Sequence, residues 1–384
     1  MADSSLTILV AGMIAGDPHQ GGAAWAVLQY VLGLRELGHD VYFVEPVTGR
    51  KLRPAGTSLR KSTSASYFRE VVRQFGLQTK AALLLREATD TAGCSYETLR
   101  ATASRADLLI NIGGVLADPA LLEPIPIRLY VDLDPAFSQL WHVSAIDVGF
   151  DRHTHFATLG LSLGDQYCPI PTCDRTWIPT RQPIVLSEWP VAKCPPNDSF
   201  TTSGNWRGYG SVTHKGIFYG QKAHALRQFI AIPAKIRQRM LLAFAPNPED
   251  TKDLSRLAAE GWNFVDPQVV AGTPDQYRDF IQGSLAEFAI AKSGYATARC
   301  GWFSDRSVCY LASGRPVIAQ ETGFSASLPT NEGLFAFETE DDALAAMDLV
   351  VSDYSRHSRA ARHIAEEYFD ANIVLPALLD RLGM

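Results

Sequence analysis

The sequence has few cysteines and no long apolar run. Its 384 residues include six cysteines, too few and too scattered for a disulfide framework, so we expect reduced thiols. No stretch of about 18 uncharged apolar residues occurs, so no membrane-spanning helix is expected. The N-terminus lacks the basic region of a secretion signal, and Gly12 interrupts its apolar stretch. We therefore expect a cytoplasmic protein whose first apolar stretch is a strand.

Positive charge is also scarce. Lys and Arg number 35 against 41 Asp and Glu, which gives a formal net charge of −6. The chain therefore lacks the broad positive field that nucleic acid or anionic lipid attracts, and we expect neither as a partner. A content of 46% hydrophobic and 20% charged residues excludes a disordered chain, and the length favours two domains over one core.

The first 135 residues alternate between strand and helix patterns. An apolar run at 6–12 predicts a buried strand, helical spacing over 27–37 predicts a helix that Gly38 ends, and 40–46 predicts a second strand. Strands separated by helices are typical of a parallel, doubly wound sheet. The alternation continues with helices at 67–75 and 96–106 and strands at 80–88, 107–114 and 127–135.

A proline-rich segment precedes a second region with the same alternation. Seven prolines lie between Cys168 and Asn197, which fits neither a helix nor a central strand. Strand and helix patterns then restart and end in a long helical tail from Asp341. We predict an α/β fold of two doubly wound Rossmann-like domains facing across a cleft at the carboxyl ends of their strands. The predicted boundaries are residues 1–190, a linker at 191–199, residues 200–370, and a helix at 371–384 that packs back on the first domain.

The strongest local signal lies between Gly301 and Phe324. A strand ends before it, Gly301 and Ser304 open a helix, and Arg306 lies in the first helical turn. Free amides, a hydroxyl and a guanidinium at a helix N-terminus form a receptor for pyrophosphate. The alternative is an ordinary crossover in which Ser304 only caps the helix and Arg306 is solvated.

Three segments in the right order carry a family resemblance. Ser313–Gly323 (SGRPVIAQETG) resembles the segment that closes the nucleotide site of GT-B glycosyltransferases. The glycine pair Gly21-Gly22 and its helix resemble the opening of the glycogen-synthase-like family 4 enzymes, and 168–180 resembles their segment before the linker. The resemblance implies a nucleotide diphosphate sugar bound by the C-terminal domain and a small-molecule or lipid-bearing acceptor bound by the N-terminal domain. It also implies retention of configuration, with no metal and no cofactor.

The resemblance assigns donor-side roles, with one departure. Two glutamates that usually hold the sugar and the ribose are missing, and Gly301, Asp305, Arg306 and Cys309 occupy that region. Candidates for the missing Arg/Lys pair are Arg207, Lys215 and Lys222; Lys222 is preferred, although a solvated surface lysine is the alternative. The predicted diphosphate ligands are Ser304, Arg306, Lys222, Gly301, Thr322 and Gly323, and the predicted nucleotide or sugar ligands are Asp305, Glu287 and Arg207.

Acceptor-side and catalytic candidates lie in the first domain. Asp132 and Asp134 end a predicted strand, where related enzymes often carry a histidine, so a carboxylate there would orient the acceptor hydroxyl or stabilise oxocarbenium-like charge. The alternative role for Asp134 is to cap the next helix. His19 is a candidate base or a solvated loop residue. Further acceptor-side candidates are Asp17, Gly21, Gly22, His153 and His155.

Two further patterns remain open at this stage. His153, His155, Cys168 and Cys173 have the residue types of a zinc site, but their spacing is loose, and we predict cleft-lining or strand residues and no metal. Residues 50–66 carry five basic side chains without apolar periodicity, which predicts a mobile loop facing an anionic acceptor or only solvent. Alternatives to a glycosyltransferase are a nucleotide-sugar epimerase on the same fold and a non-catalytic nucleotide-sugar binding module.

Overall fold

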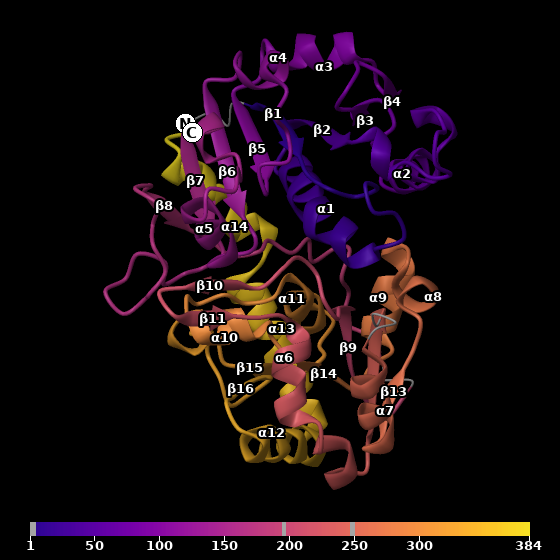
Figure 1. Cartoon of the computed structure of the whole chain (residues 1–384), viewed down its shortest axis with the longest axis vertical. Coiled ribbons are helices and arrows are strands. Elements are labelled where there is room, and N and C mark those ends of the chain that lie inside the picture. The colour runs from indigo at the N-terminus through magenta and orange to yellow at the C-terminus, as the bar shows by residue number, and fades with distance from the viewer. Residues whose placement is uncertain (1–4, 194–196, 246–249) are drawn as a thin grey trace.

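The computed structural model describes residues 5–193, 197–245 and 250–384 and contains two large sheets, one in each half of the molecule (Figure 1). The first sheet has the order β4-β3-β2-β1-β5-β6-β7-β8, and every pairing is parallel except that of β4 with β3. The parallel sheet predicted from the strand–helix alternation is confirmed, with an antiparallel edge strand that the sequence did not indicate. Its strands are β1 (Thr7–Ala11), β2 (Asp40–Val47), β3 (Ala81–Leu85), β4 (Thr91–Gly93), β5 (Leu108–Ile112), β6 (Ile127–Asp132), β7 (His155–Thr158) and β8 (Trp177–Pro179).

The second sheet is parallel throughout and has the order β13-β12-β9-β14-β15-β16. This order reverses direction between β9 and β14, as in a dinucleotide-binding domain, and ligands bind at the carboxyl ends beside such a reversal. A short antiparallel hairpin lies outside the sheet. The strands are β9 (Ser199–Asn205), β12 (Arg239–Ala245), β13 (Trp262–Phe264), β14 (Ala286–Ala289), β15 (Val317–Gln320) and β16 (Leu334–Phe337), and the hairpin consists of β10 (Val212–His214) and β11 (Ile217–Tyr219).

Helices connect the parallel strands and cover the two sheets. Because each helix buries one face on a sheet, the apolar residues predicted at helical spacing lie in the core, as Val27, Leu28, Val31 and Leu34 do. The N-terminal helices are α1 (Gly21–Glu36), α2 (Thr63–Gln74), α3 (Tyr96–Ala103), α4 (Pro119–Leu122) and α5 (Phe137–Val143). The later helices are α6 (Lys222–Leu226), α7 (Thr251–Ala259), α8 (Pro267–Ala271), α9 (Pro274–Gln282), α10 (Ser293–Ala298), α11 (Asp305–Ala312), α12 (Glu340–Ser352), α13 (Tyr354–Tyr368) and α14 (Ala371–Arg381). In this described part of the chain, no helix is both long and apolar enough to cross a membrane.

The C-terminal helix α14 returns to the N-terminal half, where it lies beside α1 (Figure 1). Gly33 of α1 makes this approach possible, because a Cβ atom there would come within 2.7 Å of Leu375 and 2.9 Å of Ala371. Ile184 and Asp370 form a parallel bridge just before α14 begins. The sequence pattern indicated one helical tail, whereas the chain breaks at Asp353 and Asp370 into three helices. Within the expected linker at 191–199, residues 194–196 lie outside the described residues.

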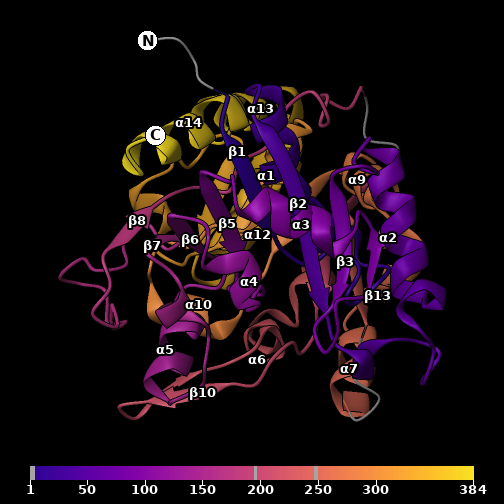
Figure 2. The same cartoon turned by 90° about the horizontal axis from the view of Figure 1, so that it is seen from above.

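The two halves are also in contact at the start of α1, where Figure 2 shows α9 beside α2. Trp25 Nε1 donates a hydrogen bond to the Pro274 carbonyl oxygen at 2.8 Å, and the Tyr67 hydroxyl donates one to the Gly272 carbonyl oxygen at 2.9 Å. A Cβ atom on Gly21 would lie 2.2 Å from the Thr273 carbonyl oxygen. This glycine therefore permits the close contact between α1 and the α8–α9 turn.

The basic segment 50–66 differs from the mobile loop expected from the sequence. It contains two short 3-10 turns, and Leu52 and Leu59 are each only 3% exposed within the core of the first domain. Helix α2 begins at Thr63, where the Ser62 hydroxyl accepts a hydrogen bond from the Ala65 amide. The expectation that nothing ties this segment to the core was wrong, because two isolated leucines are enough to anchor it.

Candidate active site

A cleft of about 430 Å³ lies between the two halves, at the carboxyl ends of strands from both sheets. Its walls carry polar side chains from segments far apart in the sequence. The described residues predicted from the sequence that line it are His19, Gly22, Asp134, Lys222, Ser304, Asp305 and Arg306. Candidates from both domains thus face the same cavity.

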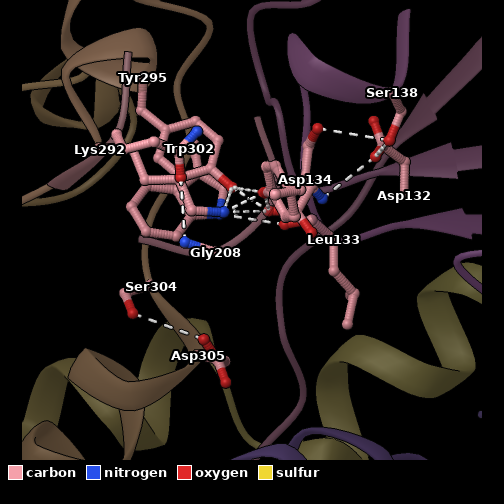
Figure 3. A network of polar contacts seen from close by, with 12 residues as sticks. Asp132, Leu133, Asp134, Ser138, Gly208, Lys292, Tyr295, Trp302, Ser304 and Asp305 are labelled. Atoms are coloured by element: carbon pink, nitrogen blue, oxygen red, sulfur yellow. Dashed lines mark hydrogen bonds and ion pairs between the residues drawn. The ribbon is translucent and has the colours of Figure 1, made fainter. Parts of the chain in front are cut away.

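Asp134 lies at the centre of this cleft and contacts the opposite domain (Figure 3). Its Oδ1 atom accepts a hydrogen bond from Lys292 Nζ at 2.9 Å and further hydrogen bonds from the hydroxyls of Tyr209 and Tyr295. Burial alone would raise the pKa of Asp134, but the Lys292 charge and the two tyrosine hydroxyls outweigh burial and lower it. Asp134 is therefore an ionised carboxylate at neutral pH.

Asp132 lies behind Asp134 and away from the cleft. Its side chain is fully buried and accepts hydrogen bonds from the Ser138 hydroxyl at 2.7 Å and the Gln139 amide at 2.8 Å. It also accepts the Asp134 backbone amide at 3.1 Å, so it shapes the turn that presents Asp134. Burial raises the pKa of Asp132 to about 6, although these hydrogen bonds oppose the shift.

The alternative role for Asp134 as a helix cap is wrong. Helix α5 begins after Ala136, whose backbone amide donates to the Gln139 side chain at 2.8 Å. The Asp134 carboxylate instead points to Lys292, as Figure 3 shows. The prediction of a cap was wrong because the backbone amide at the start of the helix, that of Ala136, binds the side chain of Gln139 within the helix.

Lys292 was not predicted from the sequence, and aromatic rings surround it. Its ammonium lies 3.7 Å from the ring centroid of Tyr209, 5.2 Å from that of Tyr295 and 5.3 Å from that of Phe137. Rings at these distances attract a cation through their negative faces. Trp302 stacks on Tyr295 with 4.0 Å between centroids. The one signal in the sequence was that Lys292 follows a buried apolar run; the sheet reversal beside it became visible only in the structure.

Arg306 lies in the first turn of α11, and two hydrogen bonds hold its guanidinium in place. Its Nε donates to the carboxylate of Glu287, which is fully buried on β14, and its Nη1 donates to the Ser203 carbonyl oxygen at 2.8 Å. Burial opposes the charge on Arg306, but Glu287 outweighs burial and raises the pKa of the guanidinium. Glu287 is thus the partner of Arg306 and does not line the cleft.

Lys222, at the start of α6, is a buried lysine that forms no ion pair with a described residue. It is 7% exposed, lines the cleft, and lies 5.3 Å from the centroid of the Phe244 ring. Burial and the nearby Arg306 charge lower the pKa of Lys222 far below its usual value. Gly204 leaves the space in front of both basic side chains open, because a Cβ atom there would lie 3.4 Å from Lys222 Nζ and 3.6 Å from Arg306 Nη1. An anion in this space would stabilise the charge on Lys222.

The other donor-side candidates divide between the cleft and its surroundings. Ser304 precedes α11 without accepting a capping hydrogen bond, and its hydroxyl lies 3.5 Å from Asp305, whose pKa burial raises against the opposing Arg306 charge. Arg207 forms a two-point ion pair with Asp250 at 2.7 and 2.8 Å and does not line the cleft. Gly301, Thr322 and Gly323 also lie outside its lining: the Gly301 amide donates to the Thr322 carbonyl oxygen, and the Gly323 amide donates to Glu321.

Some of the acceptor-side candidates also line the cleft, and others lie outside it. His19 lines the cleft and packs edge-on against Tyr67, with 5.0 Å between centroids, whereas Asp17 pairs with Lys51 at 2.8 Å outside it. Gly22 lines the cleft, where a Cβ atom would lie 2.8 Å from the Tyr277 ring. Gly21, not among the lining residues, packs against the α8–α9 turn.

The histidine pair lies elsewhere in the first domain. His153 is buried, and its two ring nitrogens lie 2.9 Å from the Asn111 amide nitrogen and 2.7 Å from the Gly149 carbonyl oxygen. Burial lowers the pKa of His153 to about 4. His155 begins β7, and neither histidine lines the cleft. Among the residues that the structure describes, no group of three His, Cys, Asp or Glu side chains is placed to hold a metal ion.

No protein-family model and no curated protein matches the sequence. Solved structures match the fold over nearly the whole chain. One is an α-glucosyltransferase in complex with UDP-glucose and DNA containing an abasic site, 10% identical over 99% of this chain and 100% of that chain, with a TM-score of 0.62. Another is HepE from Anabaena in complex with UDP and glucose, 11% identical over 98% and 99%, with a TM-score of 0.58. A glycosyltransferase from Rickettsia africae ESF-5 is 11% identical over 98% and 97%, with a TM-score of 0.53. The GT-B fold predicted from the sequence is therefore confirmed.

Proposed function

We propose that this protein is a glycosyltransferase that moves a sugar from a nucleotide diphosphate sugar to an acceptor bound by the N-terminal domain. The observation that carries the proposal is Lys222, a buried lysine that faces the cleft beside Arg306 and forms no ion pair with a described residue. Burial disfavours the charged form of an amine that has no ion pair, and an anion bound beside it restores the charge, so such a lysine in a cleft is typical of a site that an anion completes. The GT-B fold supports the same proposed function.

The two sides of the cleft would bind different parts of the substrates. The diphosphate would lie against Lys222 and Arg306, where fixed positive groups stabilise the negative charge that develops on the leaving group. The transferred sugar and the acceptor hydroxyl would lie toward Asp134, which faces this space from the other domain. Because the two groups of residues belong to different domains, closure of the cleft would complete the site and exclude water.

The finer features of the reaction are parts of the same proposal. UDP is the favoured nucleotide because the similar solved structures hold UDP. Retention of configuration and metal independence follow from the family resemblance in the sequence. A small-molecule or lipid-bearing acceptor fits a chain of net charge −6 better than DNA does, although some similar structures contain DNA.

Calorimetry with UDP tests the donor half of the proposal. Lys222→Met should weaken UDP affinity at least about tenfold, because one charge-assisted contact is worth about 1.5–3 kcal/mol. The same change should leave thermal stability equal or higher, because it replaces a buried amine that forms no ion pair with an apolar side chain of similar length. Lys252→Met, at an exposed position on α7, is the matched control and should change neither quantity. Equal UDP affinity in the wild type and Lys222→Met would contradict the assigned site.

A transfer assay tests the reaction itself. UDP-sugars are incubated with sugar, lipid-linked and duplex DNA acceptors, with and without EDTA, and the anomeric configuration of the product is read by NMR. Acceptor-dependent release of UDP supports transfer. Conversion of the donor without any acceptor would indicate an epimerase, and binding without conversion of any donor would indicate a non-catalytic module.

A further inference from the structure

Glu45 is a fully buried carboxylate in the N-terminal domain, and the proposed roles of the cleft do not use it. It lies near the end of β2, is 0% exposed, and forms no ion pair with any described residue. An isolated buried carboxylate is costly unless hydrogen bonds satisfy its oxygens. The partners of Glu45 are therefore the first thing to establish.

The partners of Glu45 are backbone amides of the loop that follows β1. The Ala15 amide donates to both carboxylate oxygens, at 3.0 and 2.8 Å, and the Gly16 amide donates to Oε1. The Ile14 amide also contributes. Gly16 fits because it has no side chain: a Cβ atom there would lie 3.0 Å from Oε1 of Glu45. The loop thus surrounds an internal carboxylate, much as backbone amides surround a bound anion.

This loop leads directly to the cleft. Two to four residues after Gly16, Pro18, His19 and Gln20 line the cavity, and α1 begins at Gly21. His19 has a left-handed backbone, with φ of 65°, so its position depends on how the preceding residues are held. Amides bound to Glu45 are also not free to bind the phosphate of a ligand. The loop can therefore contact a ligand only through Pro18, His19 and Gln20, which line the cleft.

We propose that Glu45 is a positioning residue, which holds loop 12–20 so that Pro18, His19 and Gln20 form the acceptor-side wall of the cleft. The acceptor part of this inference rests on the proposed function, whereas the link between Glu45 and the loop does not. Three charge-assisted hydrogen bonds fix the loop while the carboxylate is ionised. Glu45 itself stays buried on β2 when the loop opens, so protonation weakens these bonds and loosens the wall. Global unfolding differs, because it exposes Glu45 and is therefore opposed by protonation.

Because of its surroundings, Glu45 gains its proton near neutral pH, and the loop is expected to loosen there. Burial raises the pKa of Glu45 to about 7, against the opposing amide hydrogen bonds. Among the described residues, the titratable groups that act on it are Asp17 on the same loop and Tyr67 on α2; Lys51 pairs with Asp17. Among the residues that the structure describes, no histidine or lysine forms an ion pair or hydrogen bond with the carboxylate itself. Loosening of the loop below pH 7 would thus follow protonation of Glu45.

Hydrogen exchange of the full-length protein tests the link to the loop directly. The amides of Ala15 and Gly16 should be protected at pH 8 and lose about tenfold or more of that protection at pH 6, after correction for intrinsic exchange. Glu45→Gln keeps the shape of the side chain but replaces one acceptor by an NH2 donor, so protection should be low at both pH values. Glu70→Gln, at an exposed position on α2, is the matched control and should behave as the wild type does.

Kinetics then tests the role in the cleft. In Glu45→Gln the acceptor KM should rise about tenfold and lose its pH dependence between 6 and 8, while UDP affinity stays within twofold of wild type. Wild-type protection of Ala15 and Gly16 in Glu45→Gln, or equal wild-type protection at pH 6 and 8, would overturn the proposal. If no acceptor is ever glycosylated, the exchange measurement still decides the role of Glu45, and only the proposed function fails.

Discussion

Asp134 and Lys292 join the two halves of the molecule across the cleft, with 2.9 Å between Oδ1 and Nζ. Asp134 follows β6 of the first sheet, and Lys292 follows β14 of the second, so the pair forms only while the domains are closed. The side chains are partly open to the cleft, with 37% and 19% of their surfaces exposed. A ligand that enters this space therefore meets a charged pair and two tyrosine hydroxyls.

Asp134→Asn removes the negative charge of this residue and nearly keeps its shape. An asparagine can still accept a hydrogen bond from Tyr209, but it cannot balance positive charge in a transition state. We expect kcat to fall about a hundredfold or more, with UDP affinity unchanged, because the donor cations lie in the other domain. Steady-state kinetics and UDP calorimetry measure the two effects. A fully active, stable Asn variant would show that the charge has no catalytic role.

Lys292→Met provides the partner variant. If Asp134 and Lys292 act as one unit, the double variant should lose no more activity than the more damaging single variant. Additive losses would instead indicate separate roles for the two residues. Circular dichroism of all three variants controls for misfolding.

Arg306→Ala should have two separable effects. Loss of a phosphate contact should weaken UDP affinity about tenfold or more. Loss of the partner of Glu287 should also destabilise the fold, because an unpaired carboxylate then remains buried. Adding Glu287→Gln to this variant should restore the thermal midpoint but not the affinity. Full affinity in Arg306→Ala would remove this residue from the donor site.

Local patterns predicted most of the fold. The helix predicted to carry Arg306 in its first turn is α11, and the apolar runs 6–12 and 40–46 correspond to β1 and β2. These elements follow from apolar periodicity and from glycines at helix ends, which are properties of neighbouring residues. The hairpin of β10 and β11 escaped prediction because its strands are three residues long and largely exposed.

The site was less predictable because it depends on how the domains meet. Lys222, Arg306 and Asp134 were candidates from their places at helix starts and strand ends. Lys292 and Tyr209 were missed, since an isolated lysine or tyrosine looks solvated until the opposite domain supplies Asp134. Gly301, Thr322 and Gly323 were chosen from a motif, and their backbone contacts hold the turns around α11 instead of lining the cleft.

Gly21→Ala tests the contact between α1 and the α8–α9 turn. The new methyl group would lie 2.2 Å from the Thr273 carbonyl oxygen, so the two domains must move apart. Overpacking of this kind costs about 1–3 kcal/mol. We expect a lower Tm and a larger radius of gyration by X-ray scattering. Gly210→Ala is the control, because no atom lies within 4 Å of its Cβ position; equal scattering from both variants would contradict the predicted separation.

The basic segment 50–66 should bind an anionic group of the acceptor. Arg50, Arg60 and Lys61 are exposed and form no ion pair with a described residue, whereas Lys51 links the segment to Asp17 beside the cleft. Replacing these three residues by Gln should raise the acceptor KM and remove its dependence on salt, with UDP affinity unchanged. Substitution is preferred to deletion, which would remove the buried Leu52 and Leu59. Arg359→Gln, on α13, is the control; wild-type acceptor kinetics in the triple variant at all salt concentrations would make the segment only a connection.

Two buried carboxylates, Asp132 and Glu45, should each lower the stability of the fold as pH rises from about 4 to 7. The buried His153 opposes part of this effect, because burial lowers its pKa to about 4. The pKa of Asp132 is raised to about 6 and that of Glu45 to about 7 in the folded protein, mainly by burial, against about 4 in an unfolded chain. Between these values the two carboxylates bind more protons in the native state than in the unfolded state, so their contribution favours unfolding as pH rises. The destabilisation is absent below about pH 4 and complete above about pH 7.

Asp132→Asn isolates one of these two contributions. The variant has no carboxylate to ionise at this position, so the midpoint of urea unfolding should change less between pH 4 and 6 than in the wild type. Its midpoint should still fall between pH 6 and 7, where Glu45 continues to lose its proton. Glu260→Gln, exposed at the end of α7, is the control and should retain the wild-type profile. An equal change of the midpoint between pH 4 and 6 in the wild type and in Asp132→Asn would contradict the raised pKa of Asp132, because the variant lacks the group that loses its proton there.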